Sequence, residues 1–370
     1  MTQLVGMTWN HPRGYDPMVA TSEGWAAKTG VTITWEKRSL QDFEMFPVEE
    51  LARRYDLIVI DHPHVGEVTA KGCLAPLDDP AHGAELAALA AASVGGSFAS
   101  YTYAGRQWAF PIDAAAQVMA YRPDLAAPPA SWDEVVALAQ QGKVVFPLLP
   151  PHSLMSFFTL CANMGKPCNT GRGPLTDAAT GLEAIEMLGA VAVHLDAADF
   201  AMDPIKASEL LAEAAPRAVV MPLGYGYVSY AIDGFRANRL QFADIPLPGA
   251  RGSALGGTGI AVSAYSRHSA EAMDYAYWVA SAPVQSGLYA TSGGQPGHAT
   301  AWEAEAVNAS THDFYRATRT TLERSFVRPR HHGYMSFQDQ AAQRLTAGLQ
   351  HRVPPATILA DIERLYAESF

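Results

Sequence analysis

Cysteine is scarce in this chain, with three among 370 residues, and charged residues make up only 17% of it. So few cysteines exclude a scaffold held together by disulfides. No apolar run approaches the ~20 residues that a bilayer-spanning helix needs, which excludes a transmembrane protein. The formal net charge of −11 argues against a nucleic-acid partner, because phosphate contacts require clustered Lys and Arg side chains.

The sequence also lacks an internal repeat and a glycine-rich phosphate loop of the P-loop or dinucleotide type. The short segment Gly224-Tyr225-Gly226 does not have the spacing of either motif. We therefore expect no nucleotide cofactor.

Lysine is missing after Lys206, so the C-terminal part takes its positive charge from arginine. Residues 311–352 carry seven Arg against three acidic residues, a local excess of four positive charges. This pattern is typical of a solvated helical face, or of a short cationic rim near a ligand site. The sequence leaves both interpretations open.

Cys161 and Cys168 are seven positions apart across a Gly-containing turn (CANMGKPC). They form a disulfide if the protein matures in an oxidising compartment, or they stay two small buried apolar side chains. Spacing does not fix the geometry of the Cβ atoms, so both alternatives stand.

The N-terminal sequence MTQLVGMTWN contains no basic segment followed by an apolar stretch of roughly 7–15 residues, the pattern of a signal peptide. We expect either a cytoplasmic protein or an exported one whose leader is not part of this sequence.

The first part of the chain alternates strand and helix patterns. Residues 3–8 predict a buried strand, residues 16–29 a helix before Gly30, and VTITWE a second strand. The continuous apolar run from Leu57 to Ile60 is typical of a strand buried on both faces. This alternation predicts a parallel sheet covered by helices, in which ligands bind at the carboxyl ends of the strands. The length suggests about two domains.

The rest of the chain continues the alternation. Ser131 and Glu134 form a capping box, which predicts a helix that ends near Gly142. Beyond it we expect extended segments at 143–149, 218–224 and 256–265, and helices at 153–164, 176–194, 226–238, 269–281, 284–291, 311–323, 336–349 and 355–368.

Several motifs then follow one another in a familiar order. They are SWDEV after a Pro-rich link, MPLGYGY, GGTGIAVSA, an SGGQPG loop, and a helical end that includes RVPPATILADIERLYAES. In this succession, which covers essentially the whole chain, the sequence resembles the extracellular solute-binding proteins of bacterial ABC importers. The resemblance is to family 1, the branch of sugar- and maltose-binding proteins.

The resemblance implies an α/β protein with the two-lobed periplasmic-binding-protein fold (type II), whose ligand cleft lies between lobes joined by crossing strands. The first lobe would comprise residues 1–110 plus 262–310 and the second residues 115–255 plus 315–370. Hinge segments would lie near 110–115, 255–262 and 310–315. A ligand would close the hinge without any bond being broken, and the closed form would deliver it to ABC permease subunits. The resemblance further implies a monomeric periplasmic protein without a cofactor.

The candidate ligand-binding residues are those that this topology directs toward the cleft. They combine aromatic rings, on which sugar rings stack, with polar side chains that bind hydroxyl groups. We expect a sugar or a sugar-like ligand. A small carboxylate or other anion is the alternative, because two arginines are included. The candidates are Trp9, His11, Arg13, Asp61, His62, Asp113, Gln117, His152, Ser153, Tyr225, Tyr227, Gly257, Thr258, Gln295, Arg330, His332 and Tyr334.

Metal binding and catalysis have weaker support in the sequence than ligand binding. The pairs His62-Pro63-His64 and His331-His332 invite a metal hypothesis, but neither HxxxH nor paired Cys supports it, and we expect no metal. Some relatives of the implied fold are thiaminase-like enzymes with a cysteine nucleophile, which needs a polar site. Cys73 lies between apolar residues, so we expect a binder and not an enzyme. A cytosolic sensor or such an enzyme remains the alternative.

Overall fold

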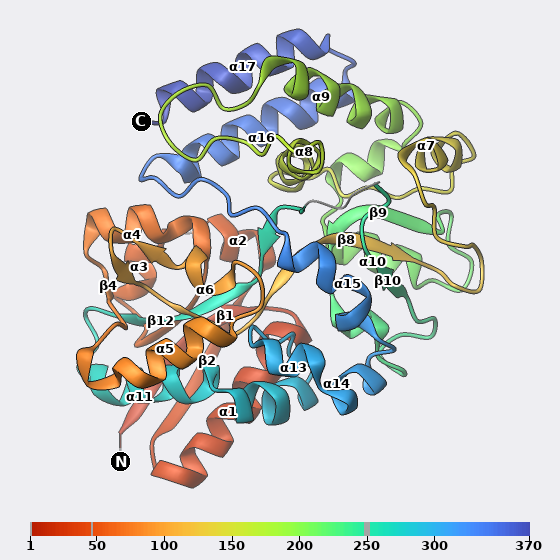
Figure 1. The fold of residues 1–370 in the computed structure, drawn as a ribbon. Coiled ribbons are helices and arrows are strands. Elements are labelled where there is room, and N and C mark those ends of the chain that lie inside the picture. The colour runs from red at the N-terminus through yellow and green to blue at the C-terminus, as the bar shows by residue number, and fades with distance from the viewer. Residues whose placement is uncertain (1, 46, 248–251) are drawn as a thin grey trace. The chain divides into compact units, whose positions relative to one another are not determined.

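The computed structural model describes residues 2–45, 47–247 and 252–370 (Figure 1). The chain forms two compact units, and each is built from several separate stretches of sequence. Unit 1 consists of residues 1–114, 256–309 and 330–332. Unit 2 consists of residues 115–255, 310–329 and 333–370. Among the described residues, no helix is long and apolar enough to cross a membrane.

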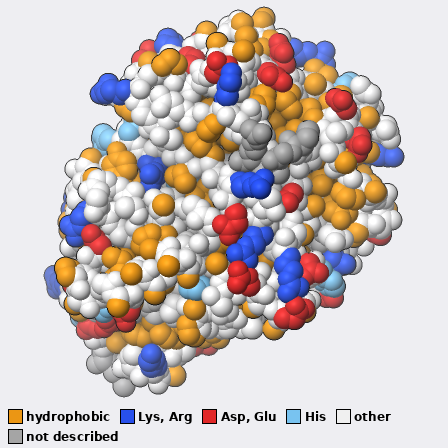
Figure 2. All heavy atoms as spheres, in the orientation of Figure 1, with side chains coloured by type: hydrophobic (Ala, Val, Ile, Leu, Met, Phe, Trp, Pro, Cys, Tyr) orange, Lys and Arg blue, Asp and Glu red, His pale blue; other side chains and the backbone are white. Residues whose placement is uncertain are grey.

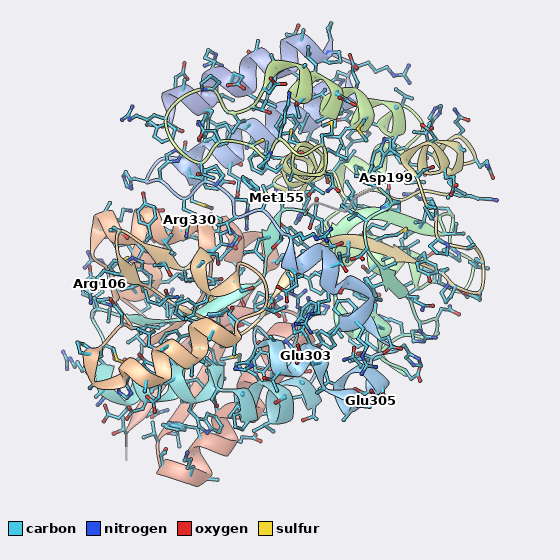
Figure 3. The ribbon with its side chains drawn as sticks, in the orientation of Figure 1. Arg106, Met155, Asp199, Glu303, Glu305 and Arg330 are labelled. Carbon is cyan, nitrogen blue, oxygen red and sulfur yellow. The ribbon has the colours of Figure 1, made fainter. Side chains whose placement is uncertain are left out.

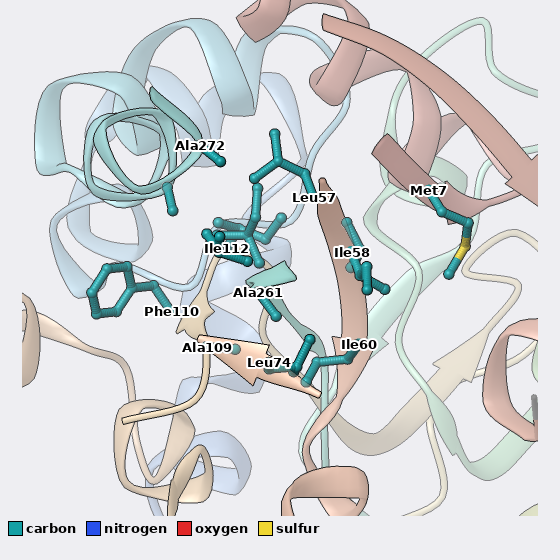
Figure 4. Packing of buried hydrophobic residues seen from close by; sticks show 14 of the residues in the cluster. Met7, Leu57, Ile58, Ile60, Leu74, Ala109, Phe110, Ile112, Ala261 and Ala272 are labelled. Carbon is teal, nitrogen blue, oxygen red and sulfur yellow. The ribbon is translucent and has the colours of Figure 1, made fainter. Parts of the chain in front are cut away.

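Unit 1 is an open sheet covered by helices. Its strands lie in the order β2-β1-β3-β12-β4, with β7 also paired to β12. β1 runs parallel to β2 and β3, and the late strand β12 runs antiparallel to β3. Figure 4 shows Leu57, Ile58 and Ile60 packed in the core around this sheet. Leu57–Ile60 is buried throughout because helices cover both faces of β3.

The bounds of the unit 1 elements follow. The strands are β1 (Gln3–Trp9), β2 (Thr32–Arg38), β3 (Leu57–Asp61), β4 (Leu74–Ala75), β5 (Thr102–Tyr103), β6 (Arg106–Gln107), β7 (Phe110–Pro111) and β12 (Thr258–Ser263). The helices are α1 (Pro12–Thr29), α2 (Leu40–Met45), α3 (Val48–Ala52), α4 (Val65–Lys71), α5 (Gly83–Ala92), α6 (Ser97–Ser100), α11 (Ser269–Ala280), α12 (Ala282–Val284) and α13 (Ala299–Glu303), with the 3₁₀ helices η1 (His62–His64) and η2 (Pro80–His82) and the π-helix η5 (Gln285–Tyr289).

Unit 2 has a smaller sheet and more helix. β8 (Ala115–Tyr121) pairs antiparallel with β9 (Val220–Tyr225) on one side and with β10 (Gln241–Ala243) on the other. α8 (His152–Asn163) is buried from His152 to Ala162, because helices of the same unit pack around it. Its apolar sequence is therefore that of a core helix and has no solvent-facing stripe.

The remaining elements complete unit 2. They are α7 (Trp132–Gln140), α9 (Ala178–Ala192), η3 (Ala197–Ala201), α10 (Pro204–Leu211), η4 (Val228–Ala231), α15 (Phe314–Glu323), α16 (Tyr334–Gln350) and α17 (Pro355–Glu368). β11 (Leu255–Gly256) and α14 (Glu305–Ser310) each contain a boundary between the units along the chain.

Most of the expected elements are confirmed, with shifts at their ends. The helix predicted at 355–368 has those bounds, and the one predicted at 153–164 begins and ends one residue earlier. The first helix begins at Pro12 instead of residue 16. His11 caps it, since its Nδ1 accepts the backbone N–H of Arg13, and Pro12 suits the first helical position.

Two expected elements are wrong. The segment 143–149 makes one isolated bridge, between Val144 and Val220, and no strand. Pro147 has no N–H to give to a ladder, which makes a regular strand unfavourable there. The helix expected at 226–238 is only the short turn η4, because Gly234 adopts a left-handed conformation (φ 81°) in the turn that follows.

Candidate functional site

The carboxyl end of β1 carries the first group of candidates. β1 ends at Trp9, whose side chain is 3% exposed and packs on Phe43 with ring centroids 5.4 Å apart. A Cβ at Gly14 would overlap the indole, so glycine lets α1 approach this ring closely. The Trp9 Nε1–H is buried and has no hydrogen-bond acceptor in the part of the chain that the structure describes. Trp9 is thus a packed side chain with one unsatisfied donor.

Arg13 and Asp113 form a buried ion pair within unit 1. Arg13 Nε lies 2.8 Å from Asp113 Oδ2, and Arg13 Nη2 lies 2.5 Å from Oδ1, which makes the contact bidentate. Both side chains are almost fully buried. Burial raises the pKa of Asp113 above its ordinary value, and the adjacent guanidinium opposes that shift. The pair brings together two candidates that lie 100 residues apart in the sequence.

Backbone hydrogen bonds connect this pair to the sheet. The N–H of Asp113 donates to the carbonyl of Thr258 at 3.1 Å, and the N–H of Thr258 donates to the carbonyl of Asp113 at 3.0 Å. Thr258 in β12 is the register partner of Asp61 in β3. Asp61 accepts the N–H of His62 at 2.8 Å and thereby caps η1. The structure therefore gathers Arg13, Asp61, His62, Asp113 and Thr258 at one edge of the unit 1 sheet.

Two more candidates lie next to this edge. The Gln295 side-chain amide donates to the carbonyl of Ala114 at 2.8 Å, and the N–H of Ala114 donates back to the carbonyl of Gln295 at 3.0 Å. The Gly257 carbonyl accepts the hydroxyl of Tyr101 at 3.4 Å. Gln295 holds the 295–297 loop and does not present a free amide within unit 1.

Tyr101 is a residue of this edge that the sequence did not single out. Its hydroxyl also donates to the carbonyl of Ile60 at 3.1 Å, so it joins the ends of β3 and the 257–258 segment. Its ring leaves no room for a side chain at 259, where a Cβ would lie 2.8 Å from it. A tyrosine between a short helix and a short strand carries no pattern that could have identified it from sequence.

Arg330 (Figure 3) belongs to unit 1 although it lies near the C-terminus. Its Nη1 donates to the carbonyls of Ala99, Ser100 and Thr102 at 3.0, 2.6 and 3.0 Å. Burial lowers the pKa of Arg330 below its ordinary value. The side chain therefore ties the 330–332 segment to the end of α6, whereas His332 is exposed.

In unit 2, Gln117 and Ser153 are completely buried and engaged in internal hydrogen bonds. Gln117 donates to Ser156 Oγ at 3.1 Å and accepts from Thr159 Oγ1 at 2.5 Å. The Ser153 hydroxyl lies 2.8 Å from that of Thr346 and 3.3 Å from the carbonyl of Ala342. These contacts join α8 to β8 and to α16, so within unit 2 both side chains serve packing.

His152 and Tyr225 are two candidates of unit 2 whose rings form a pair. Their ring centroids are 6.3 Å apart in an edge-to-face arrangement. Burial lowers the pKa of His152 to about 4, with Asp203 opposing the shift and Arg328 adding to it. His152 is therefore neutral at pH 7, and its Nδ1 has no partner among the described residues. Tyr225 is half-buried, whereas Tyr227 and Tyr334 are buried.

The three cysteines are free and buried. Burial raises the pKa of the Cys73 thiol to about 11 and that of Cys168 well above its ordinary value. A cysteine nucleophile needs the opposite shift, so neither thiol is set up for catalysis. Among the residues that the structure describes, no group of three His, Cys, Asp or Glu side chains could hold a metal ion.

Some arginines of the C-terminal part form ion pairs with neighbouring acidic residues. On α15, Arg316 contacts Asp313 at 3.1 Å and Arg319 contacts Glu323 at 3.3 Å. Figure 2 shows basic and acidic side chains beside one another on the visible face. These two arginines are thus paired as on a solvated helical face, whereas Arg330 of the same stretch contacts backbone carbonyls.

Comparison with known proteins gives one family and many similar structures. Residues 20–314 match the family model described as bacterial extracellular solute-binding protein. No curated protein matches the sequence at a significant level. Among solved structures, the maltose-bound MalE3 of T. maritima is 15% identical, covers 98% of both chains and has a TM-score of 0.83.

Two further structures are similar over their whole length. An ABC transporter solute-binding protein of Agrobacterium radiobacter in complex with ribitol is 19% identical, covering 100% of this chain and 99% of that one, with a TM-score of 0.78. One of Thermotoga lettingae bound with α-D-tagatose is 14% identical, covers 100% of both chains and has a TM-score of 0.84. These likenesses confirm the α/β periplasmic-binding-protein fold class that the sequence predicted.

Proposed function

Because this chain belongs to the bacterial extracellular solute-binding proteins, we propose that it captures a neutral polyhydroxylated solute, a sugar or a sugar alcohol, and delivers it to an ABC importer. The similar structures were solved with maltose, ribitol and tagatose, all of them neutral polyols. The ligand would contact the candidate residues of both units, whose hinge segments would close around it.

The observation that carries this proposal is the bidentate Arg13–Asp113 pair. A guanidinium and a carboxylate in contact have no net charge, and together they supply donors and acceptors. A hydroxyl group, which both donates and accepts, complements such a pair. An anionic ligand at Arg13 would lie beside the buried Asp113 carboxylate, and the repulsion between the two negative charges would oppose its binding.

Arg330 supports the same choice of ligand. Its Nη1 already donates to three backbone carbonyls of unit 1, so this group has a structural role. The two arginines that suggested a carboxylate ligand therefore both have intramolecular partners. This favours the neutral solute over the anion.

Buried donors without acceptors also fit a hydroxylated ligand. Trp9 Nε1 and the Thr258 hydroxyl are unpartnered in the described part of unit 1, and both lie at the edge where Arg13 and Asp113 meet. Unsatisfied buried polar groups are uncommon and costly in folded proteins. Ligand hydroxyls would satisfy them.

A thermal-shift screen across sugars, sugar alcohols, organic acids and amines tests the proposal. A ligand at 100 times its dissociation constant stabilises the native protein by about 2.7 kcal/mol, which raises the melting temperature measurably. We expect the stabilising compounds to be neutral polyols. Stabilisation by carboxylates alone would contradict the assignment of the ligand and leave the solute-binding role intact.

Trp9→Phe distinguishes a ligand contact from packing. The substitution removes Nε1–H and also part of a buried ring, so we expect a lower melting temperature from the lost packing. If Nε1–H also contacts the ligand, the folded variant will bind the identified polyol more weakly in calorimetry. Tyr225→Phe is the matched variant in unit 2. If both variants bind with the affinity of the parent, these residues do not contact the ligand.

The cellular part of the proposal is tested at the native locus. A protein that feeds an importer works outside the cytoplasm, so fractionation should recover it from the periplasmic or extracellular fraction. Recovery from the cytosol alone would exclude delivery to an importer and favour a ligand sensor.

A further inference from the structure

Two cysteines of unit 2 lie on either side of the turn that ends α8. Cys161 belongs to α8 and Cys168 to the loop that follows, and both are free thiols. After α8, Gly165 adopts a left-handed conformation (φ 81°). Its N–H donates to the carbonyl of Ala162 at 3.0 Å, and that of Lys166 to the carbonyl of Cys161 at 3.2 Å. These bonds form a Schellman motif, which turns the chain back towards Cys161.

The two sulfur atoms are neighbours in the core of unit 2. The Thr176 hydroxyl donates to Cys161 Sγ at 4.0 Å, and it also interacts with the Cys168 side chain, as the Cys161 thiol does. Both cysteines belong to one cluster of buried side chains, with Cys161 0% and Cys168 3% exposed. Because the thiols already interact, only a local movement is needed to join them.

The loop formed by residues 168–176 is held by the C-terminal helix α17 (Figure 1). The Glu363 carboxylate accepts the N–H groups of Leu175 and Thr176 at 2.7 and 3.0 Å. The Tyr366 hydroxyl lies 2.8 Å from two backbone carbonyl oxygens of the loop. These bonds attach the loop to α17, and a covalent bond at its first residue would attach it to α8 as well.

Folding shields both thiols from reagents in the solvent. Burial raises the pKa of Cys168 well above its ordinary value, whereas the thiolate is the form that attacks a disulfide. Cys73, the third cysteine, is also buried and belongs to unit 1. We therefore expect oxidation to join Cys161 to Cys168, and to do so while the chain folds and the thiols are still accessible.

We propose that Cys161 and Cys168 form a disulfide when the chain folds in contact with a disulfide oxidant, and that this bond links the 168–176 loop to α8. Extracytoplasmic compartments supply such oxidants, so the cellular setting of the bond, but not its formation, rests on the proposed function.

The bond forms by two successive thiol–disulfide exchanges. The thiolate of one cysteine attacks a sulfur atom of the oxidant and releases one thiolate, which leaves a mixed disulfide. The thiolate of the other cysteine then attacks the protein sulfur of that mixed disulfide and releases the second thiolate. The two cysteines lose two electrons and two protons, and the disulfide of the oxidant is reduced to two thiols.

Refolding of the full chain with glutathione tests the proposal. The reduced protein is unfolded in urea, refolded in equimolar reduced and oxidised glutathione, unfolded again with iodoacetamide and digested with trypsin. Lys166 precedes a proline, so both cysteines remain in one peptide, residues 144–172, and Cys73 lies in another. We expect iodoacetamide to modify Cys73 alone, and peptide 144–172 to be two hydrogens lighter than its dithiol form. Two modified cysteines in that peptide, or a bond to Cys73, would overturn the proposal.

Urea unfolding with and without reductant measures the effect of the bond. The disulfide closes a ring of eight residues, so we expect it to lower the equilibrium constant of unfolding on the order of 50-fold. Cys73→Ala should keep this response to reductant, and Cys161→Ala combined with Cys168→Ala should lose it. Identical curves for the oxidised and reduced parent would refute the link between the loop and α8. Both experiments work without a ligand, so this proposal and the solute-binding proposal fail independently.

Discussion

His152 begins α8 and is buried in unit 2, where it stays neutral because its pKa is lowered to about 4. In the unfolded chain a histidine has a pKa of about 6.5. Between these values the unfolded state binds more protons than the native state, so the free energy of unfolding falls as the pH decreases. This contribution is complete above pH 6.5 and is lost progressively towards pH 4.

We therefore expect the parent protein to lose up to about 3 kcal/mol more stability than His152→Gln between pH 6.5 and pH 4. Urea unfolding of both proteins at several pH values measures this difference in stability. Titrations of all other groups occur in both proteins and cancel in the comparison. Parallel curves for the two proteins would mean that His152 is protonated in the native state or accessible to water.

Arg13 and Asp113 allow a test of a buried ion pair by a double-mutant cycle. Asp113→Asn leaves the guanidinium buried without its counter-charge, and we expect a loss of about 3–5 kcal/mol in the free energy of unfolding. Arg13→Met combined with Asp113→Asn removes both charges and should cost less than the sum of the single variants. Additive losses would show that the two side chains do not interact energetically.

At the scale of the elements, the contact between α4 and the 330–332 segment depends on a glycine. A Cβ at Gly66 would overlap the carbonyl oxygen of Arg330, so the two backbones touch where no side chain fits. We expect Gly66→Ala to destabilise the protein by about 1–3 kcal/mol and to lower its melting temperature, because a backbone cannot yield as a flexible side chain does.

Gly189 in α9 is the matched control for this substitution. A Cβ there would meet nothing within 4 Å, so Gly189→Ala should stabilise the helix by roughly 0.5–1 kcal/mol. Equal effects of the two alanines on the melting temperature would contradict the role of the close approach at Gly66.

At the scale of the whole molecule, the proposed function requires a change of shape. A solute that contacts both units shifts the equilibrium towards a closed form, and the shift is limited by its differential affinity for the two forms. We expect saturating polyol to reduce the radius of gyration in X-ray scattering. A sugar that gives no thermal shift is the control, and superimposable curves with and without the bound polyol would refute hinge closure.

The order of elements could be predicted from the sequence because it rests on local chemistry. The apolar run Leu57–Ile60 is β3, and the helices predicted at 153–164 and 355–368 were within one residue of their bounds. The succession of motifs also led to the fold class and the family. The spacing of apolar residues, the capping residues and the turn residues all depend on neighbours in the chain. These local signals suffice to predict where helices and strands lie.

Only the tertiary structure decided which side chains meet and what each does. The sequence placed Arg13 and Arg330 in the same class of candidate, but one pairs with Asp113 and the other with three carbonyls near Ala99. It could not identify Tyr101, and it did not reveal that the amide of Gln117, a predicted ligand contact, is bonded within unit 2. These outcomes depend on contacts between residues distant in sequence and on burial, which removes competing water and thereby sets charge and pKa.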